Sequence, residues 1–379
     1  MTPVVSATVD AAALRHNLAV VRERAPRSRV MAVIKANAYG HGLAAAARAL
    51  HAADAFAVAR VEEGLALRAA GINKTVVLLE GVFGREQIAA AAAADFDLVV
   101  HSLEQVELLR GAEFAAPNRF TVWLKLDTGM NRLGLNEAAF AQALETLRSL
   151  PSVRQPVKLM THLASADEPQ LATTANQLAR FAAATRSLPG ERSVANSAGL
   201  LNFADARADW VRPGLLLYGV SPMADRTGSD YGLRPAMTLQ SRIIAVKDVA
   251  AGEQVGYGGV WTARRPTRLA VAAIGYGDGY PRSLGAGTPV LVNGRRALLA
   301  GRVSMDMTSI DVTDIEPPPR LADRVVLWGE GLAVEEIARH AETIPYELLC
   351  GISQRVAVDI CDGASSAAAG GLSSRRIPF

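Results

Sequence analysis

The side chains best suited to chemistry stand where apolar, strand-like runs end. Lys35 directly follows the run VMAVI, and an ammonium group is costly to bury without a partner. Lys35 is either the first solvated residue after a strand or a member of a site. Hydroxyls, bases and further cations stand at or beside the ends of other such runs: Tyr39, Lys125, Asp127, Arg132, His162, Asn196, Ser197 and Arg212. If the fold brings these side chains together, they form a candidate active site.

Such residues need a fold that gathers strand ends in one place. Over about the first 220 residues, continuous apolar runs alternate with alanine-rich helical segments, as expected of a parallel sheet buried on both faces. The predicted strands are 30–36, 55–59, 75–80, 97–101, 120–127, 157–163, 193–197 and 215–220. Eight runs with crossover helices favour a (β/α)8 TIM-type barrel, whose sites lie where the strands end. A doubly wound open sheet is the alternative, although no GxGxxG motif follows the first run.

The pattern changes after about residue 235, where β-prone runs with turn signals replace the alanine-rich helices. Asn293-Gly294 between two such runs predicts a hairpin, and one clear helix is expected to begin near Ala333. The chain is therefore predicted to be an α/β protein. Its barrel would cover residues 1–234, and a mostly β C-terminal domain would cover 235–379.

The composition argues against several classes of protein. The 379 residues carry a formal net charge of only +3, and no basic cluster is interleaved with aromatic residues, so no nucleic-acid partner is expected. Cys350 and Cys361, without a CxxC pair or an HExxH motif, suggest neither a disulfide framework nor a metal site. No run approaches the roughly 18 apolar residues of a membrane span, and no signal-peptide pattern opens the chain. A cytoplasmic protein is expected.

Nine segments, in order along the chain, resemble one known family. They read AVIKANAYGHG, KLDTGMNRLG, THLASAD, ANSAG, VRPGLLLYG, GYGGVWTA, GYGDGY, GRVSMDM and IPYELLCGISQRV. Together they are similar to alanine racemase, a pyridoxal 5'-phosphate (PLP) enzyme with a fold-type III barrel, from about residue 5 to about residue 358. Ser304 stands where the family often has cysteine, and Asn131 where glycine is frequent. Neither position carries a catalytic role.

The resemblance implies a head-to-tail homodimer in which each site joins one subunit's barrel mouth to the other's C-terminal domain. PLP is expected on Lys35, whose amine forms a Schiff base with the cofactor's aldehyde. PLP acidifies the substrate Cα–H, and a two-base reaction then needs Lys35 on the D-alanine side and Tyr257 of the partner subunit on the L-alanine side. A free tyrosine has a pKa of about 10, so His162 and Arg212 are expected to assist Tyr257. Arg212 is also expected to face the pyridine nitrogen.

The resemblance assigns the remaining site residues as well. The phosphate is expected to be held by Tyr39, Ser197, Gly214, Leu215 and Tyr346, and the other cofactor contacts are Arg132, His162 and Asn196. Arg132 would meet the PLP phenolic oxygen or the substrate carboxylate. Its neighbour Lys125 would be carbamylated; the alternative is that Asp127 neutralises the pair. The partner subunit would lend the substrate pocket Met305 and Asp306, and the entrance residues would be Asp167, Tyr276, Arg282 and Arg302.

Three other functions remain open at this stage. A broader-specificity amino-acid racemase has the same fold. An amino-acid decarboxylase of this fold would need a cysteine donor and usually a carboxylate at the ring nitrogen, whereas VRPG and GYGG supply arginine and tyrosine. A non-catalytic PLP-binding protein would be a lone barrel, which the second half of the chain disfavours. Supply of D-alanine for peptidoglycan and alanine catabolism are both compatible with the sequence.

Overall fold

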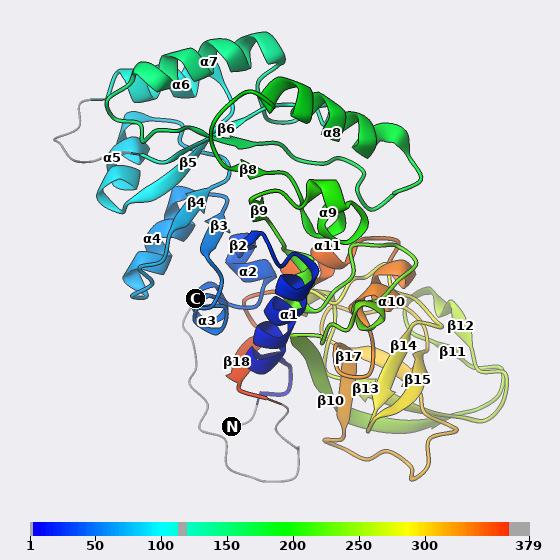
Figure 1. The fold of residues 1–379 in the computed structure, drawn as a ribbon. Coiled ribbons are helices and arrows are strands. Elements are labelled where there is room, and N and C mark those ends of the chain that lie inside the picture. Colours follow the sequence, from blue (N-terminus) through cyan, green and yellow to red (C-terminus); the bar gives the residue numbers. More distant parts are fainter. Residues whose placement is uncertain (1–2, 113–119, 364–379) are drawn as a thin grey trace.

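The computed structural model describes residues 3–112 and 120–363. A closed barrel surrounded by helices stands beside a second domain built mainly of antiparallel strands (Figure 1). The predicted α/β fold, a (β/α)8 TIM-type barrel followed by a mostly β domain, is confirmed. No helix in the described ranges is long and apolar enough to cross a membrane.

Eight parallel strands form the barrel, and β2 pairs with β9 to close it. In order they are β2 (Arg29–Val33), β3 (Ala55–Val58), β4 (Val76–Leu78), β5 (Phe96–Val100), β6 (Val122–Lys125), β7 (Lys158–Met160), β8 (Arg192–Ser193) and β9 (Trp210–Val211). Their side chains are buried almost throughout, because the barrel interior and the helical layer cover both faces. The continuous apolar runs in the sequence reflect this double burial.

The alanine-rich segments form the helices around the barrel. They are α1 (Ala11–Arg24), α2 (Lys35–Tyr39), α3 (Leu43–Ala49), α4 (Val61–Ala69), α5 (Arg85–Ala93), α6 (Leu103–Arg110), α7 (Glu137–Ser149), α8 (Ala172–Thr185) and α9 (Ser197–Asn202). Several begin at a polar side chain that accepts from the first turn: Asp10 before α1, Ser102 before α6 and Asn136 before α7.

The predicted strand at 215–220 is wrong. The last barrel strand is β9, and Leu215–Tyr218 forms a 3₁₀ helix. Pro213 has no N–H to continue the ladder, so the chain leaves the sheet there. Leu215–Tyr218 is nevertheless fully buried, which explains the misleading signal: an apolar run reports burial and does not separate a strand from a buried turn.

The second domain contains a long mixed sheet in the order β13-β16-β15-β14-β17-β10-β1-β18. Its elements are β10 (Met237–Val249), β13 (Thr267–Ala272), β14 (Pro289–Val292), β15 (Arg295–Leu299), β16 (Thr308–Asp311), β17 (Arg324–Trp328), α10 (Val334–His340), α11 (Pro345–Cys350) and β18 (Ala357–Cys361), with a separate hairpin of β11 (Gln254–Val255) and β12 (Trp261–Thr262). The predicted Asn293-Gly294 hairpin joins β14 to β15, and the helix expected near Ala333 is α10. Helix α11 was not predicted.

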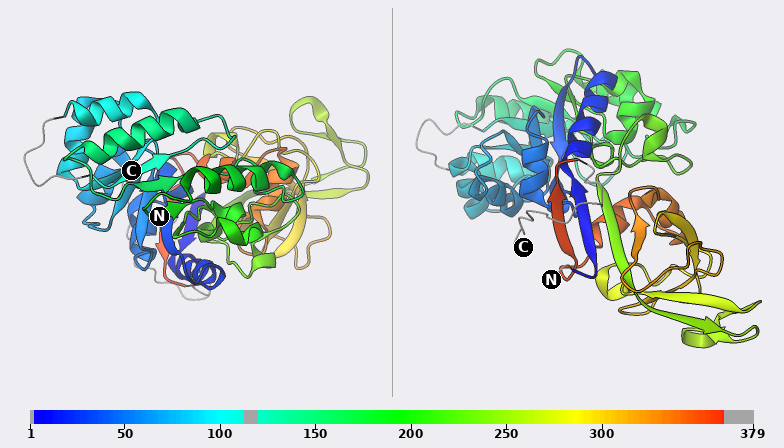
Figure 2. Two further views of the ribbon diagram at one scale, coloured as in Figure 1. Left: turned by 45° about the horizontal axis from the view of Figure 1, so that its top comes forward. Right: turned by 90° about the horizontal axis from the view of Figure 1, so that it is seen from below.

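The first strand of the chain belongs to this second sheet. β1 (Ser6–Asp10) pairs antiparallel with β10 and parallel with β18, and the three strands run side by side in Figure 2. The sequence analysis assigned this segment to the barrel domain. The position of β1 is set by hydrogen bonds to strands far away in the sequence, and the local residue pattern does not indicate which strands will pair.

Helix α11 joins the second domain to the barrel mouth by packing against α2. Gly40, which ends α2, has a φ of 79°, and a Cβ there would lie 2.2 Å from the carbonyl oxygen of Leu349 in α11. Only glycine combines this backbone conformation with so close an approach. The contact brings Tyr346 and Cys350 of α11 to the strand ends of the barrel.

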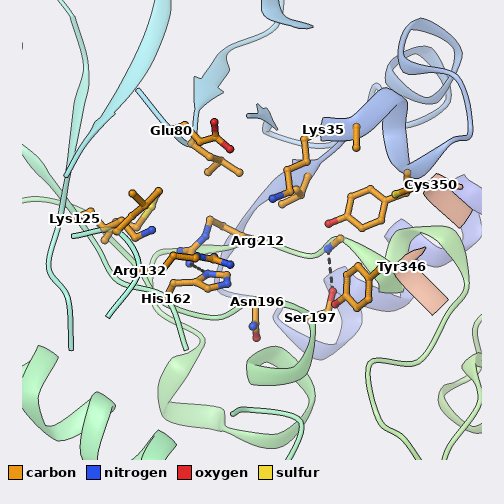
Figure 3. A pocket seen from close by; sticks show the side chains of 17 residues that line it. Lys35, Glu80, Lys125, Arg132, His162, Asn196, Ser197, Arg212, Tyr346 and Cys350 are labelled. Carbon is orange, nitrogen blue, oxygen red and sulfur yellow. Dashed lines mark hydrogen bonds between the residues drawn. The ribbon is translucent and has the colours of Figure 1, made fainter. Parts of the chain in front are cut away.

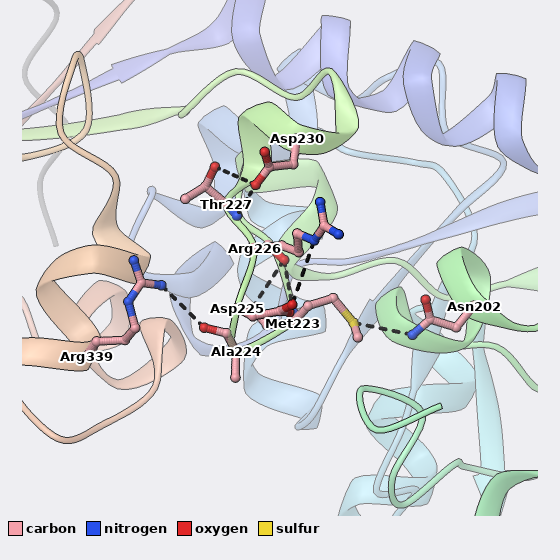
Figure 4. Close-up of polar contacts among 9 residues, drawn as sticks. Asn202, Met223, Ala224, Asp225, Arg226, Thr227, Asp230 and Arg339 are labelled. Carbon is pink, nitrogen blue, oxygen red and sulfur yellow. Dashed lines mark hydrogen bonds and ion pairs between the residues drawn. The ribbon is translucent and has the colours of Figure 1, made fainter. Parts of the chain in front are cut away.

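The segment that leaves the barrel is held by α10. Glu335 is buried, and its Oε1 accepts from the backbone N–H groups of Ser221 and Gly228, each at 2.8 Å. In the same segment the Arg339 guanidinium donates to the carbonyl oxygen of Ala224 at 3.3 Å (Figure 4). These contacts fix the second domain relative to the barrel.

Replacing Glu335 with alanine is expected to destabilise the protein by about 2–4 kcal/mol, because two buried N–H groups lose their acceptor. Glu335→Gln retains Oε1 and should cost less. Glu336→Ala on the same helix removes an exposed ion pair with Arg296 and should cost at most about 1 kcal/mol. Urea unfolding midpoints compare the variants. Equal midpoints for the two alanine variants would show that Glu335 does not hold the junction.

Candidate active site

A cavity of about 500 Å³ opens at the carboxyl ends of the barrel strands. Four of its lining residues are cations: Lys35, Lys125, Arg132 and Arg212. Among the described residues that line it, Glu80 is the only carboxylic acid. In the view of Figure 3, Lys125 and Arg132 lie toward one end, Ser197 and Tyr346 toward the other, and Lys35 and Arg212 between them. The excess of positive charge makes the cavity suited to an anionic ligand.

Lys35 enters the cavity from an unusual backbone turn. Residues 36–39 all have φ between 53° and 54°, so this turn of α2 is left-handed although none of the four is glycine. Each such residue costs roughly 1–2 kcal/mol. Tertiary contacts compensate, since Glu63 accepts from the Ala36 N–H at 2.6 Å and Asn37 accepts from the Leu43 N–H at 2.8 Å. Strain maintained at one place by its surroundings is typical of functional sites.

Arg212 occupies the floor of the cavity and is almost fully buried. Its Nη1 donates to the hydroxyl of Ser193 at 2.6 Å, and its Nη2 donates to the carbonyl oxygen of Thr161 at 2.7 Å. Nη2 also lies 3.2 Å from Nδ1 of His162 (Figure 3). Burial lowers the pKa of Arg212 to about 10, so the guanidinium stays charged at neutral pH. Its Nε donates to no described residue and remains available to the cavity.

The contact with Arg212 fixes the state of His162. A guanidinium only donates, so Nδ1 of His162 accepts and Nε2 carries the proton. Burial, and after it the positive charge of Arg212, hold the pKa of His162 well below its usual range. His162 is therefore a neutral imidazole locked in one tautomer.

Lys125 ends β6 and is buried among other cations. Burial, followed by the charges of Arg212 and Arg132, lowers the pKa of Lys125 to about 8, while Asp127 opposes the shift. Asp127 also accepts from the backbone N–H groups of Gly129 and Asn131, so it orders the loop that carries Arg132. Asp127 therefore offsets only part of the effect of burial and of the neighbouring cations on Lys125.

The other end of the cavity presents hydroxyls and backbone N–H groups. The Ser197 hydroxyl accepts from the Gly214 N–H at 2.9 Å, and Asn196 rather than Ser197 caps α9 through the Gly199 N–H. A Cβ on Gly214 would lie 2.5 Å from the Tyr39 hydroxyl, so the backbone comes close to that phenol. Tyr346 from α11 completes this end, with its ring centre 5.8 Å from that of Tyr39. Leu215 follows Gly214 in a buried position and does not line the cavity.

Tyr257 does not line the cavity of its own chain. It belongs to the short turn between β11 and β12, two strands that lie at the outer side of the second domain in Figure 1. Of the Tyr257 surface, 69% is exposed. Gly256, Gly258 and Gly259 around it have φ values of 74°, 72° and 54°, so the GYGG motif forms a tight turn that leaves the phenol exposed. Arg302 is its neighbour across this turn, close to Gly258.

Met305, Asp306 and Tyr276 share one exposed surface of the second domain, also away from the cavity. The Gly277 N–H donates to the Met305 carbonyl oxygen, whereas the Met305 N–H donates to no described residue. Asp306 forms an ion pair with Arg355 at 2.6 Å, and Arg355 also binds the buried Asp278 at 2.7 Å. Sequence reasoning missed Arg355, because an exposed arginine at the end of a segment carries no distinctive local signal.

The remaining expected entrance residues, Asp167 and Arg282, do not line the cavity. Asp167 is exposed. Burial, followed by the negative charge of Asp167, raises the pKa of the Tyr346 phenol to about 12. Arg282 is exposed and does not line the cavity. Among the lining residues with a titratable side chain, two were not predicted as part of the site, Glu80 and Cys350. Glu80 could have been found, because it ends an apolar strand as Lys35 does; Cys350 reaches the cavity only through the packing of α11.

Comparison with known proteins places the chain in a family. The alanine racemase N-terminal domain model matches residues 9–222 and the C-terminal domain model residues 236–360. The alanine racemase of Shewanella amazonensis is 50% identical over 364 residues, covering 94% of this chain and 99% of the relative, and that of Aeromonas hydrophila is 51% identical over 354 residues, covering 92% and 97%.

Solved structures agree with the sequence relatives. The biosynthetic alanine racemase of Pseudomonas aeruginosa superposes with a TM-score of 0.91 at 46% identity, covering 95% of this chain and 100% of that chain. The alanine racemase of Bartonella henselae, whose structure contains covalently bound pyridoxal phosphate, gives 0.84 at 30% identity, covering 95% and 100%.

A closed barrel with a lysine-bearing cavity at its strand ends, followed by a β domain, is the architecture of a barrel enzyme. The two family models span nearly the whole chain, and the relatives match it almost end to end. The chain belongs to the alanine racemase family of isomerases.

The cationic surroundings of Lys125 lead to a titration prediction. In CO2-free buffer, acylation of Lys125 should rise as pH passes through about 8, because its amine loses its proton there. Arg132→Met removes a neighbouring positive charge and should move that midpoint upward. Competitive labelling with mass spectrometry measures both, with the exposed Lys247 as internal reference. A Lys125 curve that coincides with that of Lys247 and ignores Arg132→Met would contradict the prediction.

Proposed function

We propose that this chain interconverts L-alanine and D-alanine, with PLP bound at Lys35. The observation that carries the proposal is the cavity with Lys35 and three further cations, in a chain that is about half identical to alanine racemases. The cavity residues fit the cofactor. PLP offers an aldehyde for Lys35, a phosphate for the end with Ser197 and Tyr346, and a basic ring nitrogen for a donor such as Arg212.

The protein residues act around the bound group. The hydroxyls of Tyr39, Ser197 and Tyr346 and the backbone at Gly214 would hold the phosphate. Leu215 does not line the cavity, so its proposed contribution is limited to its backbone N–H. Arg212 would donate to the ring nitrogen, and because it stays charged it would disfavour protonation of that nitrogen. When PLP is bound, it acidifies the substrate Cα–H. Lys35 then takes or returns the proton on one face of that carbon.

The opposite face needs a second base, which the proposal assigns to Tyr257 of the partner subunit. Support comes from position: Tyr257 is remote from its own cavity and strongly exposed, and it lies on the same domain as the exposed Met305 and Tyr276. A head-to-tail homodimer would bring this surface to the neighbouring barrel mouth. The free Met305 N–H is then available to a substrate carboxylate, with Asp306 held in the loop by Arg355.

The neutral His162 and the buried Arg212 form one hydrogen-bonded unit that faces the cavity, and the proposal gives them the task of assisting the second base. Arg132 meets the cofactor phenolic oxygen or the substrate carboxylate. Lys125 is proposed to be carbamylated, which its lowered pKa supports, because carbon dioxide reacts with a neutral amine. A carbamate would replace a repelling cation by an anion beside Arg132. Asp167, Tyr276, Arg282 and Arg302 are proposed at the entrance.

The role of Lys35 can be tested directly. Borohydride reduction of the parent should attach a pyridoxyl group to Lys35, and Lys35→Ala should lose both this label and about 10³-fold or more of racemisation. Peptide mass spectrometry and loss of optical rotation of L-alanine are the measurements, with Lys247→Ala as control and L-serine as second substrate. A labelled parent that leaves L-alanine unchanged would indicate a PLP-binding protein without racemase activity.

The shared site predicts complementation between inactive chains. Equal mixing of Lys35→Ala and Tyr257→Phe proteins with subunit exchange should restore about a quarter of the parent activity, because half of the dimers then hold one intact site. The double variant should instead lower the activity of parent chains mixed with it, since every mixed dimer then lacks an intact site. Absence of both effects, with exchange confirmed by mass, would place both bases within one chain.

A further inference from the structure

His41 is a fully buried histidine that the proposed reaction does not use. It stands two residues after Tyr39, at the end of the left-handed turn. Its Nδ1 lies 3.0 Å from the carbonyl oxygen of Ala38 and 2.9 Å from that of Tyr39. Carbonyl oxygens only accept, so Nδ1 carries the proton. Nε2 is buried and has no partner within the described part of the chain.

The imidazole is held between the turn and an aromatic neighbour. Its ring centre lies 4.5 Å from that of Tyr218, and the Tyr218 ring in turn lies 4.8 Å from Tyr39. The Tyr218 hydroxyl donates to the carbonyl oxygen of Val33 at 3.0 Å, two residues before Lys35. His41 and Tyr218 therefore hold the backbone on the two sides of Lys35.

The turn needs such support more than most segments. Four left-handed non-glycine residues cost several kcal/mol in total at roughly 1–2 kcal/mol each, so the segment would relax without tertiary restraint. The His41 Nδ1–H is a side-chain donor directed at the carbonyls of two of these residues. Burial lowers the pKa of His41 to about 4, so the imidazole stays neutral and adds no further positive charge beside Lys35.

We propose that His41 is a positioning residue. Its Nδ1–H donates to the Ala38 and Tyr39 carbonyl oxygens and thereby fixes the orientation of both Lys35 and the Tyr39 hydroxyl. The inference rests on the proposed function, in which Lys35 carries the cofactor and Tyr39 meets its phosphate. His41 does not contact the reacting atoms. It acts through the geometry of the turn, where a displacement of about 1 Å can cost about 10²-fold in rate.

Two substitutions separate positioning from packing. In His41→Asn the side-chain amide takes the place of Nδ1 and can still donate to the two carbonyls. In His41→Gln the amide reaches the place of Nε2, where no described residue accepts. Both substitutions remove the aromatic ring, so the two variants differ mainly in the position of the side-chain N–H donor.

Holoenzyme forms of both variants would be compared with the parent. We expect His41→Asn to keep kcat for L-alanine within about threefold of the parent and His41→Gln to lose about 10–100-fold, with KM little changed. Hydrogen exchange at the Gly40 and Gly42 amides, which close the turn through Ala36 and Asn37, should rise only in His41→Gln. Equal kcat and equal exchange in the two variants would overturn the assignment, whatever their melting temperatures.

The parent protein gives a readout that needs no folded variant. The ¹⁵N spectrum of its histidines should contain a neutral Nδ1–H imidazole at His41, whereas His162 should be the Nε2–H tautomer. An Nε2–H imidazole at His41 would refute the proposal. If the parent itself forms no pyridoxyl adduct at Lys35, the proposed function fails, and that outcome is distinct from a parent that is labelled while the two variants behave alike.

Discussion

The left-handed turn between Ile34 and Gly40 is the constraint on which the site depends. A parallel strand that ends at Val33 would normally lead into a right-handed turn and carry the next side chains away along the helical layer. Here the reversed turn gives both Lys35 and Tyr39 to the cavity within five residues. The conformation is unfavourable for each residue in it, so it persists only because surrounding groups bind its backbone. Glu63 holds its start, and the close approach of α11 at Gly40 holds its end.

The cavity is also electrostatically unfavourable by itself. Burial lowers the pKa values of Lys125 and Arg212, the neighbouring cations lower that of Lys125 further, and His162 remains neutral. An anion in the cavity would relieve this repulsion, and any ligand that binds only the folded state stabilises it. The same positive charge therefore provides affinity for an anionic ligand.

The parts of the proposed site come from distant segments of the chain. Tyr346 reaches the barrel through α11 of its own second domain, whereas Tyr257 and Met305 are exposed and do not line the cavity of that barrel. The second sheet is itself completed by β1, the first strand of the chain. These connections make the second domain a rigid platform instead of a loosely tethered module.

The fold class and most of the polar cavity residues could be predicted from the sequence. Continuous apolar runs report burial on both faces, and polar residues at strand ends must meet at one mouth once a parallel barrel closes, so Lys35, Lys125, His162 and Arg212 were predictable. The pairing of β1 with β10, the position of Cys350 and the reversed hand of the turn after Lys35 could be seen only in the tertiary structure. These three features follow from contacts between distant segments, which can outweigh local preference and leave no periodic signal in the chain. The 3₁₀ helix at Leu215–Tyr218 differs, because it follows Pro213 and was mistaken for a strand since its apolar residues are buried.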